Sequence, residues 1–537
     1  MNSYSYRLAA FSTSLLIELM CYAQAPNLGL LLAEADASEG YTLFTPGLNT
    51  NVYLIDNCGE IVNQWNFSET PGATCYLLED GTLLRAGTDS LELRDWDNTL
   101  LWSYAMNDNG LKQHHDIEPL PNGNILCLLS DNYTKAEIIA AGRDPGNVGA
   151  IFILDKLVEL QPIGTNDASV VWEWKFIDHF VQDLDSTKLN YDVVEDHPEL
   201  LDLNFPSAHD NDWTHVNAVD YNASLDQIII SARHLSEVYI IDHSTTTAEA
   251  AGHTGGNANM GGDFLWRWGN PQIYRQGGPS NQQLFLQHDC RWVESGYLDA
   301  DKISVYNNGG DGTGTFSSVH LITPEISGGI YQKQTNTFLP ADFEWSWNGA
   351  FLGVTMLEGK KCGAYSLPNG NFLICESSRG QASEISKNGD HLWTYKNPVG
   401  ASFFNQYDTI VLGINTIFRA EKYPGSYPGL VGKDLTPQGI IEDQNSNSDS
   451  CATVVLPGIK DIKTKSITMV NPIAGGEIQF NQIVNAASIT ITDINGKVVF
   501  NQSGFNGNSF SVDLRPAVYF LRIQAGEDNG NLKIIIL

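Results

Sequence analysis

Residues 365–395 read YSLPNGNFLICESSRGQASEISKNGDHLWTY, and the pattern in this stretch decides the fold. It predicts a hairpin around the turn Asn369-Gly370 and ends in the aromatic tag Trp393-Thr394-Tyr395. The dipeptide Asn-Gly accepts the positive φ of a tight hairpin turn. Residues two apart on a strand face the same side, so the tag places two large rings on one face of a sheet.

The same tag, a tryptophan followed two residues later by another aromatic residue, occurs six times along the chain. The tags are Trp65-Asn66-Phe67, Trp102-Ser103-Tyr104, Trp172-Glu173-Trp174, Trp266-Arg267-Trp268, Trp345-Ser346-Trp347 and Trp393-Thr394-Tyr395. Six repeats of about four strands predict an all-β protein built as a six-bladed β-propeller, in which the rings fill the wedge between blades. A long β-sandwich or a solenoid is the alternative.

The chain divides into four predicted segments. Residues 1–25 have a mostly apolar stretch and the cleavage site Ala23-Gln24-Ala25, which is typical of a signal peptide. The propeller is expected at 26–430, a polar linker at 431–465 and a small β-sandwich at 466–537. No stretch reaches about 18 uninterrupted apolar residues, so the sequence predicts no membrane span.

Two long insertions interrupt the third and fourth repeats, at 176–203 and 245–262. The first is acidic and is expected to be partly helical. Long loops on a propeller usually gather at one end and shape a pocket there.

Charge limits the partners of the protein. The net charge of −33 comes from 63 acidic and 30 basic residues. Such a surface repels nucleic acids and anionic lipid head groups, so neither is an expected partner.

The cysteines point to no metal or redox motif, because the sequence contains no CxxC. Cys58 and Cys75 flank one predicted hairpin and could be bridged in an oxidising compartment.

Histidines fall at the start of the first strand in three repeats, at His115, His215 and His288. In the last repeat Cys362 takes this place, eight residues before Gly370. The first strand of each propeller blade lines the central axis, so these residues should converge at one mouth of the channel. Several imidazoles there could donate hydrogen bonds, transfer protons or attack an electrophile.

Other uses of these histidines stay open. A single histidine near a strand start is more often a buried donor to a loop carbonyl. A metal site made from the three imidazoles is another option, but Asp116 and Asp289 should alternate away from the axis, and no HExxH or HxH spacing occurs. We therefore predict no metal and no cofactor.

Side chains near the histidines are candidates for binding a substrate. Trp213 could stack on an aromatic ring or simply pack in the core. Arg233, His234 and Arg379 close similar strands in their repeats and could clamp an anion or form ordinary ion pairs.

Six motifs follow one another along the first 430 residues. They are Gly40-Tyr-Thr-Leu-Phe-Thr-Pro, His114-His-Asp-Ile-Glu, Asp212-Trp-Thr-His-Val-Asn, Ser231-Ala-Arg-His, Gln287-His-Asp and Leu367-Pro-Asn-Gly-Asn-Phe-Leu-Ile. With them the chain resembles the bacterial arylsulfotransferase family over roughly residues 40–430. Asn471-Pro472, Thr492-Asp-Ile-Asn-Gly-Lys-Val-Val and Pro516-Ala-Val-Tyr-Phe-Leu-Arg-Ile resemble the sorting domain of the type IX secretion system.

The first resemblance implies a six-bladed enzyme that moves a sulfuryl group from a phenyl sulfate ester to another phenol, without a nucleotide donor. It implies a ping-pong reaction in which a histidine takes the sulfuryl group. The predicted catalytic residues are His215, His288 and His115. The predicted substrate-binding residues are His114, Arg233, His234, Trp213, Cys362 and Arg379. The second resemblance implies the secretion machinery as a partner, and export across both membranes to the medium or the cell surface.

The chain departs from the family at two places. The stretch Asn307–Thr315 lacks an arginine that the family carries there, and Lys360-Lys361-Cys362 stands where the family has its sulfuryl-accepting histidine. Lys360 or Lys361 could replace the lost charge, and His115 could replace the acceptor. The second hypothesis is therefore a propeller without catalysis that binds a glycan, a phenolic compound or a protein.

Overall fold

The structure is a computed structural model that describes residues 25–206, 209–455, 477–493, 497–512, 514–515, 517–525 and 528–536. Except for residue 25, the predicted signal peptide lies outside this part of the chain. The chain forms two compact units, Met1–Ala452 and Thr453–Leu537. None of the helices in the described ranges is long and apolar enough to cross a membrane.

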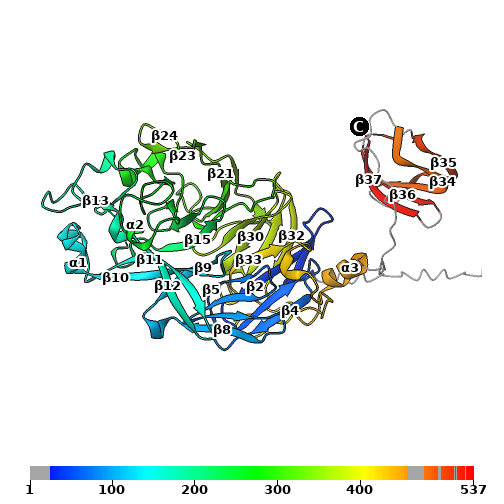
Figure 1. The fold of residues 1–537 in the computed structure, drawn as a ribbon. Coiled ribbons are helices and arrows are strands. Elements are labelled where there is room, and N and C mark those ends of the chain that lie inside the picture. Colours follow the sequence, from blue (N-terminus) through cyan, green and yellow to red (C-terminus); the bar gives the residue numbers. More distant parts are fainter. Residues whose placement is uncertain are drawn as a thin grey trace, which may run out of the picture. The chain divides into compact units, whose positions relative to one another are not determined.

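The first unit contains six antiparallel sheets that follow one another along the chain (Figure 1). The first three are β33 (Ile417–Tyr423), β2 (Tyr41–Pro46), β3 (Asn51–Ile55) and β4 (Ile61–Asn66); β5 (Pro71–Leu77), β6 (Leu83–Gly87), β7 (Ser90–Arg94) and β8 (Leu100–Ala105); and β9 (Gln113–Pro119), β10 (Ile125–Thr134), β11 (Ile151–Ile163) and β12 (Asp167–Lys175).

The remaining three sheets complete the set. They are β15 (Val216–Asn222), β16 (Gln227–Ala232), β17 (Glu237–Asp242) and β18 (Trp266–Trp268); β19 (His288–Trp292), β20 (Ile303–Asn307), β21 (Ser318–Ile322) and β26 (Trp345–Trp347); and β29 (Gly363–Ser366), β30 (Phe372–Glu376), β31 (Gln381–Ile385) and β32 (His391–Lys396). The first strands β33, β5, β9, β15, β19 and β29 each contact the next, and β29 contacts β33. This closed ring of inner strands confirms the six-bladed propeller.

Both ends of the unit help to close the ring. The late strand β33 lies beside the early strand β2 (Figure 1). Tyr41 pairs with Tyr423 in this register. β1 (Gly29–Ala33) adds a fifth strand outside β32 of the last blade. The first and sixth blades are therefore each assembled from segments that lie far apart in the sequence.

The aromatic tags lie on the outer strands, and their first tryptophan links each blade to the next. The indole Nε1 groups donate from Trp65 to Asp95 O, Trp102 to Asp167 O, Trp172 to Thr245 Oγ1, Trp266 to Leu339 O, Trp345 to Lys387 O and Trp393 to Asn57 O. The last of these bonds runs from the sixth blade back to the first. The tags therefore provide both apolar filling and a circular set of hydrogen bonds.

The insertions contain little regular structure. α1 (Lys135–Ala140) lies between β10 and β11, and α2 (Thr247–Ala250) lies between β17 and β18. The acidic insertion at 176–203 forms short 3-10 turns and a two-stranded parallel pair, β13 (Phe180–Val181) with β14 (Leu201–Asp202). Small hairpins β22 (Ile326–Ser327)–β23 (Ile330–Tyr331), β24 (Lys333–Gln334)–β25 (Thr337–Phe338) and β27 (Ala350–Phe351)–β28 (Val354–Thr355) surround β26.

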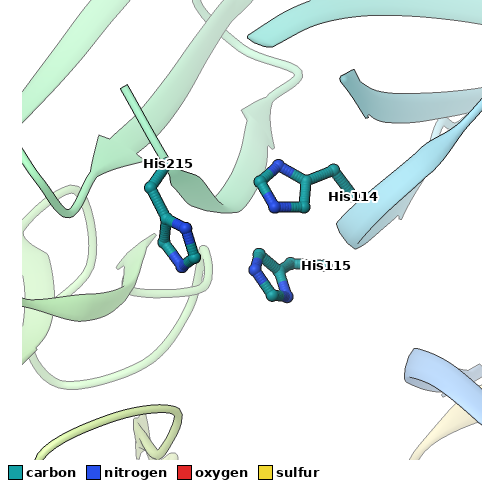
Figure 2. A group of neighbouring side chains, drawn as sticks. All are labelled: His114, His115 and His215. Carbon is teal, nitrogen blue, oxygen red and sulfur yellow. The ribbon is translucent and has the colours of Figure 1, made fainter. Parts of the chain in front are cut away.

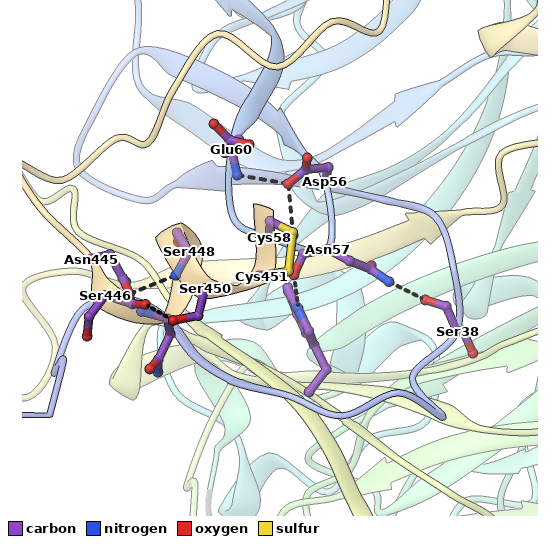
Figure 3. Close-up of a disulfide and its surroundings, with 12 residues drawn as sticks. Ser38, Asp56, Asn57, Cys58, Glu60, Asn445, Ser446, Ser448, Ser450 and Cys451 are labelled. Carbon is purple, nitrogen blue, oxygen red and sulfur yellow. Dashed lines mark hydrogen bonds between the residues drawn. A yellow bond between two sulfur atoms is a disulfide. The ribbon is translucent and has the colours of Figure 1, made fainter. Parts of the chain in front are cut away.

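A disulfide fixes the end of the propeller unit (Figure 3). It joins Cys58, in the turn after β3, to Cys451 in α3 (Ser446–Val455). The suggested Cys58–Cys75 bridge is therefore wrong, because Cys75 points into the apolar core between the first two blades. Residues 431–452, the first part of the predicted linker, lie in the same compact unit as the blades.

The second unit is a small antiparallel sheet with its own apolar core. Its strands are β34 (Glu477–Asp493), β35 (Val498–Ser511), β36 (Ala517–Ala525) and β37 (Asp528–Ile536), in the order β35-β34-β36-β37. The core contains Ile489, Ile491 and Leu521. Repeated register shifts between β34 and β35 bend this pair.

Candidate active site at the mouth of the axis

Four successive inner strands begin at residues with left-handed backbone. The φ angles are 70° at His115, 44° at His215, 54° at Asp289 and 81° at Cys362. The pairing register shifts beside the first three of these positions. Such residues cost about 1–2 kcal/mol each when they are not glycine, and bulges re-aim the side chains next to them. The strained starts therefore alter which side chains enter the mouth of the axis.

Three imidazoles come together at this mouth. Figure 2 shows His114 and His115, from β9, pointing toward His215, which directly precedes β15. The ring centroids lie 4.2 Å apart for His114 and His115, 4.8 Å for His115 and His215, and 5.2 Å for His114 and His215. Two adjacent blades thus supply three rings to one cluster.

Carboxylates contact the Nδ1 atoms of two of these rings, those of His114 and His215. Asp155 Oδ1 lies 2.5 Å from His114 Nδ1, and Asp212 Oδ2 lies 2.5 Å from His215 Nδ1. A carboxylate can only accept, so both Nδ1 atoms carry protons. Asp155 itself is fixed on β11 because its Oδ2 accepts from Val216 N and Thr214 Oγ1. The orientations of His114 and His215 are therefore set by buried or half-buried acids.

The electrostatics of His114 and His115 differ. Burial lowers the pKa of His114, but the carboxylate of Asp155 outweighs it and the net pKa is raised. Burial lowers the pKa of His115 well below its usual value, and repulsion from the nearby His114 and Arg419 adds to this. His114 therefore holds a proton more tightly than the neighbouring His115 does.

His115 has a free nitrogen. Within the described ranges, its buried Nε2 has no hydrogen-bond partner. The ring stacks on Phe418 of the closing strand, with centroids 6.1 Å apart. A buried polar atom without a partner is costly and marks a candidate ligand contact.

His234 and Arg233 extend the site along the β16–β17 connection. His234 Nδ1 donates to Asp212 O at 2.6 Å, and burial lowers its pKa to about 4. The guanidinium of Arg233 donates through Nη2 to Gly359 O, while its buried Nε has no hydrogen-bond partner among the described residues. Arg233 therefore brings a positive charge with unused donor capacity to the same end of the axis.

His288 uses both ring nitrogens within the protein. Its Nδ1 lies 2.7 Å from Asn308 Oδ1, and its Nε2 accepts from Lys361 N at 3.0 Å. Burial lowers its pKa well below the usual value, so the ring is neutral. The ring therefore fixes the backbone of Lys361 at the start of the last blade, and neither nitrogen is free to attack a substrate.

Three predicted substrate contacts lie in other surroundings. Trp213 is fully buried and packs against Phe152 and Arg143, so it cannot stack on a substrate and the core-packing alternative is correct. Cys362 is also fully buried, its sulfur accepts from Ser377 N, and burial raises its thiol pKa well above the usual value. Arg379 forms an ion pair with Glu376.

An ion-pair network links the inner strands near the histidines. Arg419 on β33 donates to Asp116 Oδ2 at 2.7 Å and Asn217 O at 2.9 Å, and its Nε lies 3.1 Å from Asp289 Oδ1. One side chain thus joins four blades. The expectation that Asp116 and Asp289 turn away from the axis is wrong, because the bulged strand starts break the alternation of side chains. Since two acids neutralise Arg419, it does not replace the missing family arginine.

Sequence reasoning missed Asp155, Asp212 and Arg419. The sequence did offer a signal for Asp212, because it stands three residues before His215 in the motif Asp212-Trp-Thr-His-Val-Asn. Asp155 lies in a long outer-blade strand with no motif around it. Arg419 reaches the axis only because the chain's late strand β33 completes the first blade.

The histidines also meet the spacing of a metal site. Ligand atoms of His114, His115 and His215 lie within 4.8 Å of one another, as do those of Asp212, His215 and His234. Carboxylates on the far nitrogen are common behind metal-bound histidines as well. A chelator distinguishes a metal site from a cluster of metal-free imidazoles, because it abolishes activity only if the cluster works through a bound metal.

The fold and the site define a six-bladed propeller with a histidine cluster at one mouth of its axis. The family described as Arylsulfotransferase (ASST) matches residues 37–319, and the secretion system C-terminal sorting domain matches residues 471–537. The chain belongs to the arylsulfotransferase family and ends in a type IX sorting domain. This confirms the resemblance, and the sorting domain directs the protein across the outer membrane, for release or attachment at the cell surface. The family match ends before the last blade.

Solved structures with similar folds are distant. A protein of unknown function from Bacteroides caccae is 12% identical with a TM-score of 0.39, over 72% of this chain and 98% of its own. Virginiamycin B lyase from Staphylococcus aureus is 9% identical with a TM-score of 0.32, over 73% and 97%. A putative 6-phosphogluconolactonase from Bacteroides fragilis is 10% identical with a TM-score of 0.34, over 72% and 99%. No curated protein matches the chain. These similarities are too low to bear on function.

Proposed function

We propose that the protein transfers a sulfuryl group from a phenolic sulfate ester to a phenol, with His115 as the covalent carrier. The observation that supports this most directly is the free Nε2 of His115, whose pKa is strongly lowered, beside His114, whose pKa is raised. A nucleophile needs a lone pair, and the sulfuryl oxygens need positive charge around them. The family membership supplies the reaction class.

The reaction balances through these two histidines. His115 Nε2 attacks the sulfur, the ester S–O bond breaks, and His114 Nε2–H protonates the departing phenolate. In the second half, the acceptor phenol gives its proton back to His114, and its oxygen takes the sulfuryl group from His115. Both halves use the same acid–base group, as the symmetry of two phenols requires.

Neighbouring residues position the reactants. Arg233 places its charge and unused donor near the sulfuryl oxygens. His215, held by Asp212, lies beside His115 with ring centroids 4.8 Å apart and lines the space in which the acceptor phenol binds. His288 positions Lys361 rather than the substrate.

The test is transfer from a chromogenic aryl sulfate to an added phenol by the purified protein. We expect phenol release that depends on the acceptor, a sulfated acceptor as product, and loss of both in His115→Gln. His197→Gln is the matched control, because His197 pairs with Asp192 and Glu199 in the acidic insertion. A chelator should leave the rate unchanged. Full activity in His115→Gln contradicts the proposal, as does a loss of activity with chelator that occurs without a fall in the melting temperature.

One observation favours a second function, a binding propeller without turnover. The place of the family's acceptor histidine is taken by the enclosed Cys362. This alternative predicts saturable binding of the aryl sulfate with no release of phenol under any acceptor concentration.

A further inference from the structure

A second histidine cluster lies where the two long insertions meet. His179 ends the 3-10 turn Phe176–His179 that follows β12 of the third blade. His253 and Asp263 lie between β17 and β18 of the fourth blade, in and just after the other insertion. None of these residues belongs to the axial cluster.

Both imidazoles face one carboxylate. His179 Nδ1 and His253 Nδ1 each lie 2.8 Å from Asp263 Oδ1, and His253 Nδ1 lies 3.1 Å from Oδ2. The two rings are nearly perpendicular, at 88°. The possible ligand atoms of the three residues all lie within 4.8 Å of one another.

A contact to a backbone carbonyl shows which ring nitrogen of His179 carries a proton. Its Nε2 lies 2.9 Å from Ala250 O, and a carbonyl only accepts, so Nε2 carries a proton. In the neutral ring Nδ1 then has a lone pair that faces a carboxylate oxygen, which also only accepts. Either a proton on Nδ1, which makes the ring an imidazolium, or a metal ion between the three groups removes this conflict. A backbone carbonyl on the far nitrogen is also the usual second contact of a metal-bound histidine.

The surroundings hold the buried half of the cluster rigidly. His179 is fully enclosed and Asp263 is 5% exposed, whereas the side chain of His253 is 58% exposed. Trp174 stacks on His179 at 5.3 Å with an interplanar angle of 5°, and its indole donates to Gly262 O. A Cβ at Gly262 would lie 2.7 Å from His179 Nε2, so only glycine fits. His179 and Asp263 are thus held in place by their surroundings, whereas His253 reaches the site from the surface.

We propose that His179, His253 and Asp263 bind one divalent transition-metal ion, with Zn²⁺ as the best match, and that this ion fastens the insertion at 245–262 to the third blade. Two imidazoles and a carboxylate suit Zn²⁺, whereas Ca²⁺ and Mg²⁺ favour oxygen ligands. Bonds of about 2.0–2.1 Å in a tetrahedron separate the ligand atoms by roughly 3.3 Å. Both imidazoles lie 2.8 Å from Asp263 Oδ1, so each of these two contacts must open by about half an ångström when the ion binds.

The test measures Zn²⁺ binding to the whole chain after a chelator has been dialysed away. Titration calorimetry should show binding that weakens by at least about 100-fold in His253→Ala, more than loss of a mere second contact causes. Co²⁺ at this site should give the visible absorption of tetrahedral coordination. Zn²⁺ should also raise the melting temperature of the wild type and not that of His253→Ala.

Two variants separate this site from others. His197→Ala is the matched control for an exposed histidine in an insertion, and it should bind as the wild type does. His115→Gln removes the axial cluster and should also keep this site, so failure of the sulfuryl-transfer proposal leaves the metal proposal standing. Unchanged Zn²⁺ affinity in His253→Ala, or no Zn²⁺ binding by the wild type, overturns it.

Discussion

The substitution Asp155→Asn tests the proposed charge on His114 with little change of shape. Asparagine can still accept from Val216 N and Thr214 Oγ1 through its Oδ1, which retains the structural role of Asp155. Its amide then faces His114 Nδ1 as a donor, so the ring becomes a neutral acceptor there.

The magnitude follows from the bond that is lost. A charge-assisted hydrogen bond at this 2.5 Å contact, on an acid that is 1% exposed, contributes about 1.5–3 kcal/mol. Because His114 acts as the acid, kcat/KM at neutral pH should fall by roughly 10- to 150-fold.

The pH profile gives a second measure of the same effect. His114 is active when protonated, so activity falls as the pH rises through its pKa. Asp155 and then Asp212 raise that pKa, whereas burial and Lys112 oppose them. In Asp155→Asn burial dominates, so the alkaline limb should move to lower pH.

The assay is the rate of chromogenic aryl sulfate turnover from about pH 5 to 9, at a fixed acceptor concentration. Asp192→Asn is the control, since it alters another acid–histidine pair, at the surface, 3.3 Å from His197. Wild-type kcat/KM with an unmoved alkaline limb in a folded Asp155→Asn protein would refute the role of His114.

Three further substitutions test the scaffold. Cys451→Ser opens the bridge to Cys58, which spans 393 residues, and should lower stability by about 2–5 kcal/mol; an unchanged melting temperature on calorimetry would count against the bridge. Burial raises the pKa of Glu376 to about 7, so the stability that its bound proton contributes to the folded state is lost as the pH rises toward 7. The free energy of unfolding in urea should therefore fall by about 3 kcal/mol between pH 5 and 8 in the wild type but not in Glu376→Gln. The same dependence of stability on pH in both proteins would disprove this. Trp393→Phe removes the bond to Asn57 O and should cost about 1–2 kcal/mol in the same assay, with no loss if ring closure is unimportant.

The blades were predictable because each one repeats the same local sequence pattern, a set of short strands that ends in an aromatic tag. Tags such as Trp102-Ser103-Tyr104 put two rings on an outer strand, and the structure shows what they fill and which carbonyl they bond. The closure was not predictable, because β33 and β2 pair across more than 370 residues without a shared motif. The partner of Cys58 was missed for the same reason, since α3 returns to the first blade from the far end of the unit.

Only those site residues that occupy equivalent positions at the starts of inner strands could be predicted from the sequence. His115 and His215 share a phase, and the structure brings their rings within 4.8 Å. Trp213 precedes His215 by two residues, but it lies before the strand begins and its ring packs between blades. Alternation failed at Asp116 and Asp289 because bulges with positive φ interrupt it, and local sequence gave no sign of them.

The covalent intermediate is the most direct test of the proposed chemistry. The protein is incubated with an aryl sulfate and no acceptor, quenched in alkali, digested and mapped by tandem mass spectrometry. We expect one added sulfuryl group per chain, on His115, which disappears when a phenol is supplied. Release of phenol with His115 unmodified, or a sulfuryl group on His288 instead, would contradict the assignment.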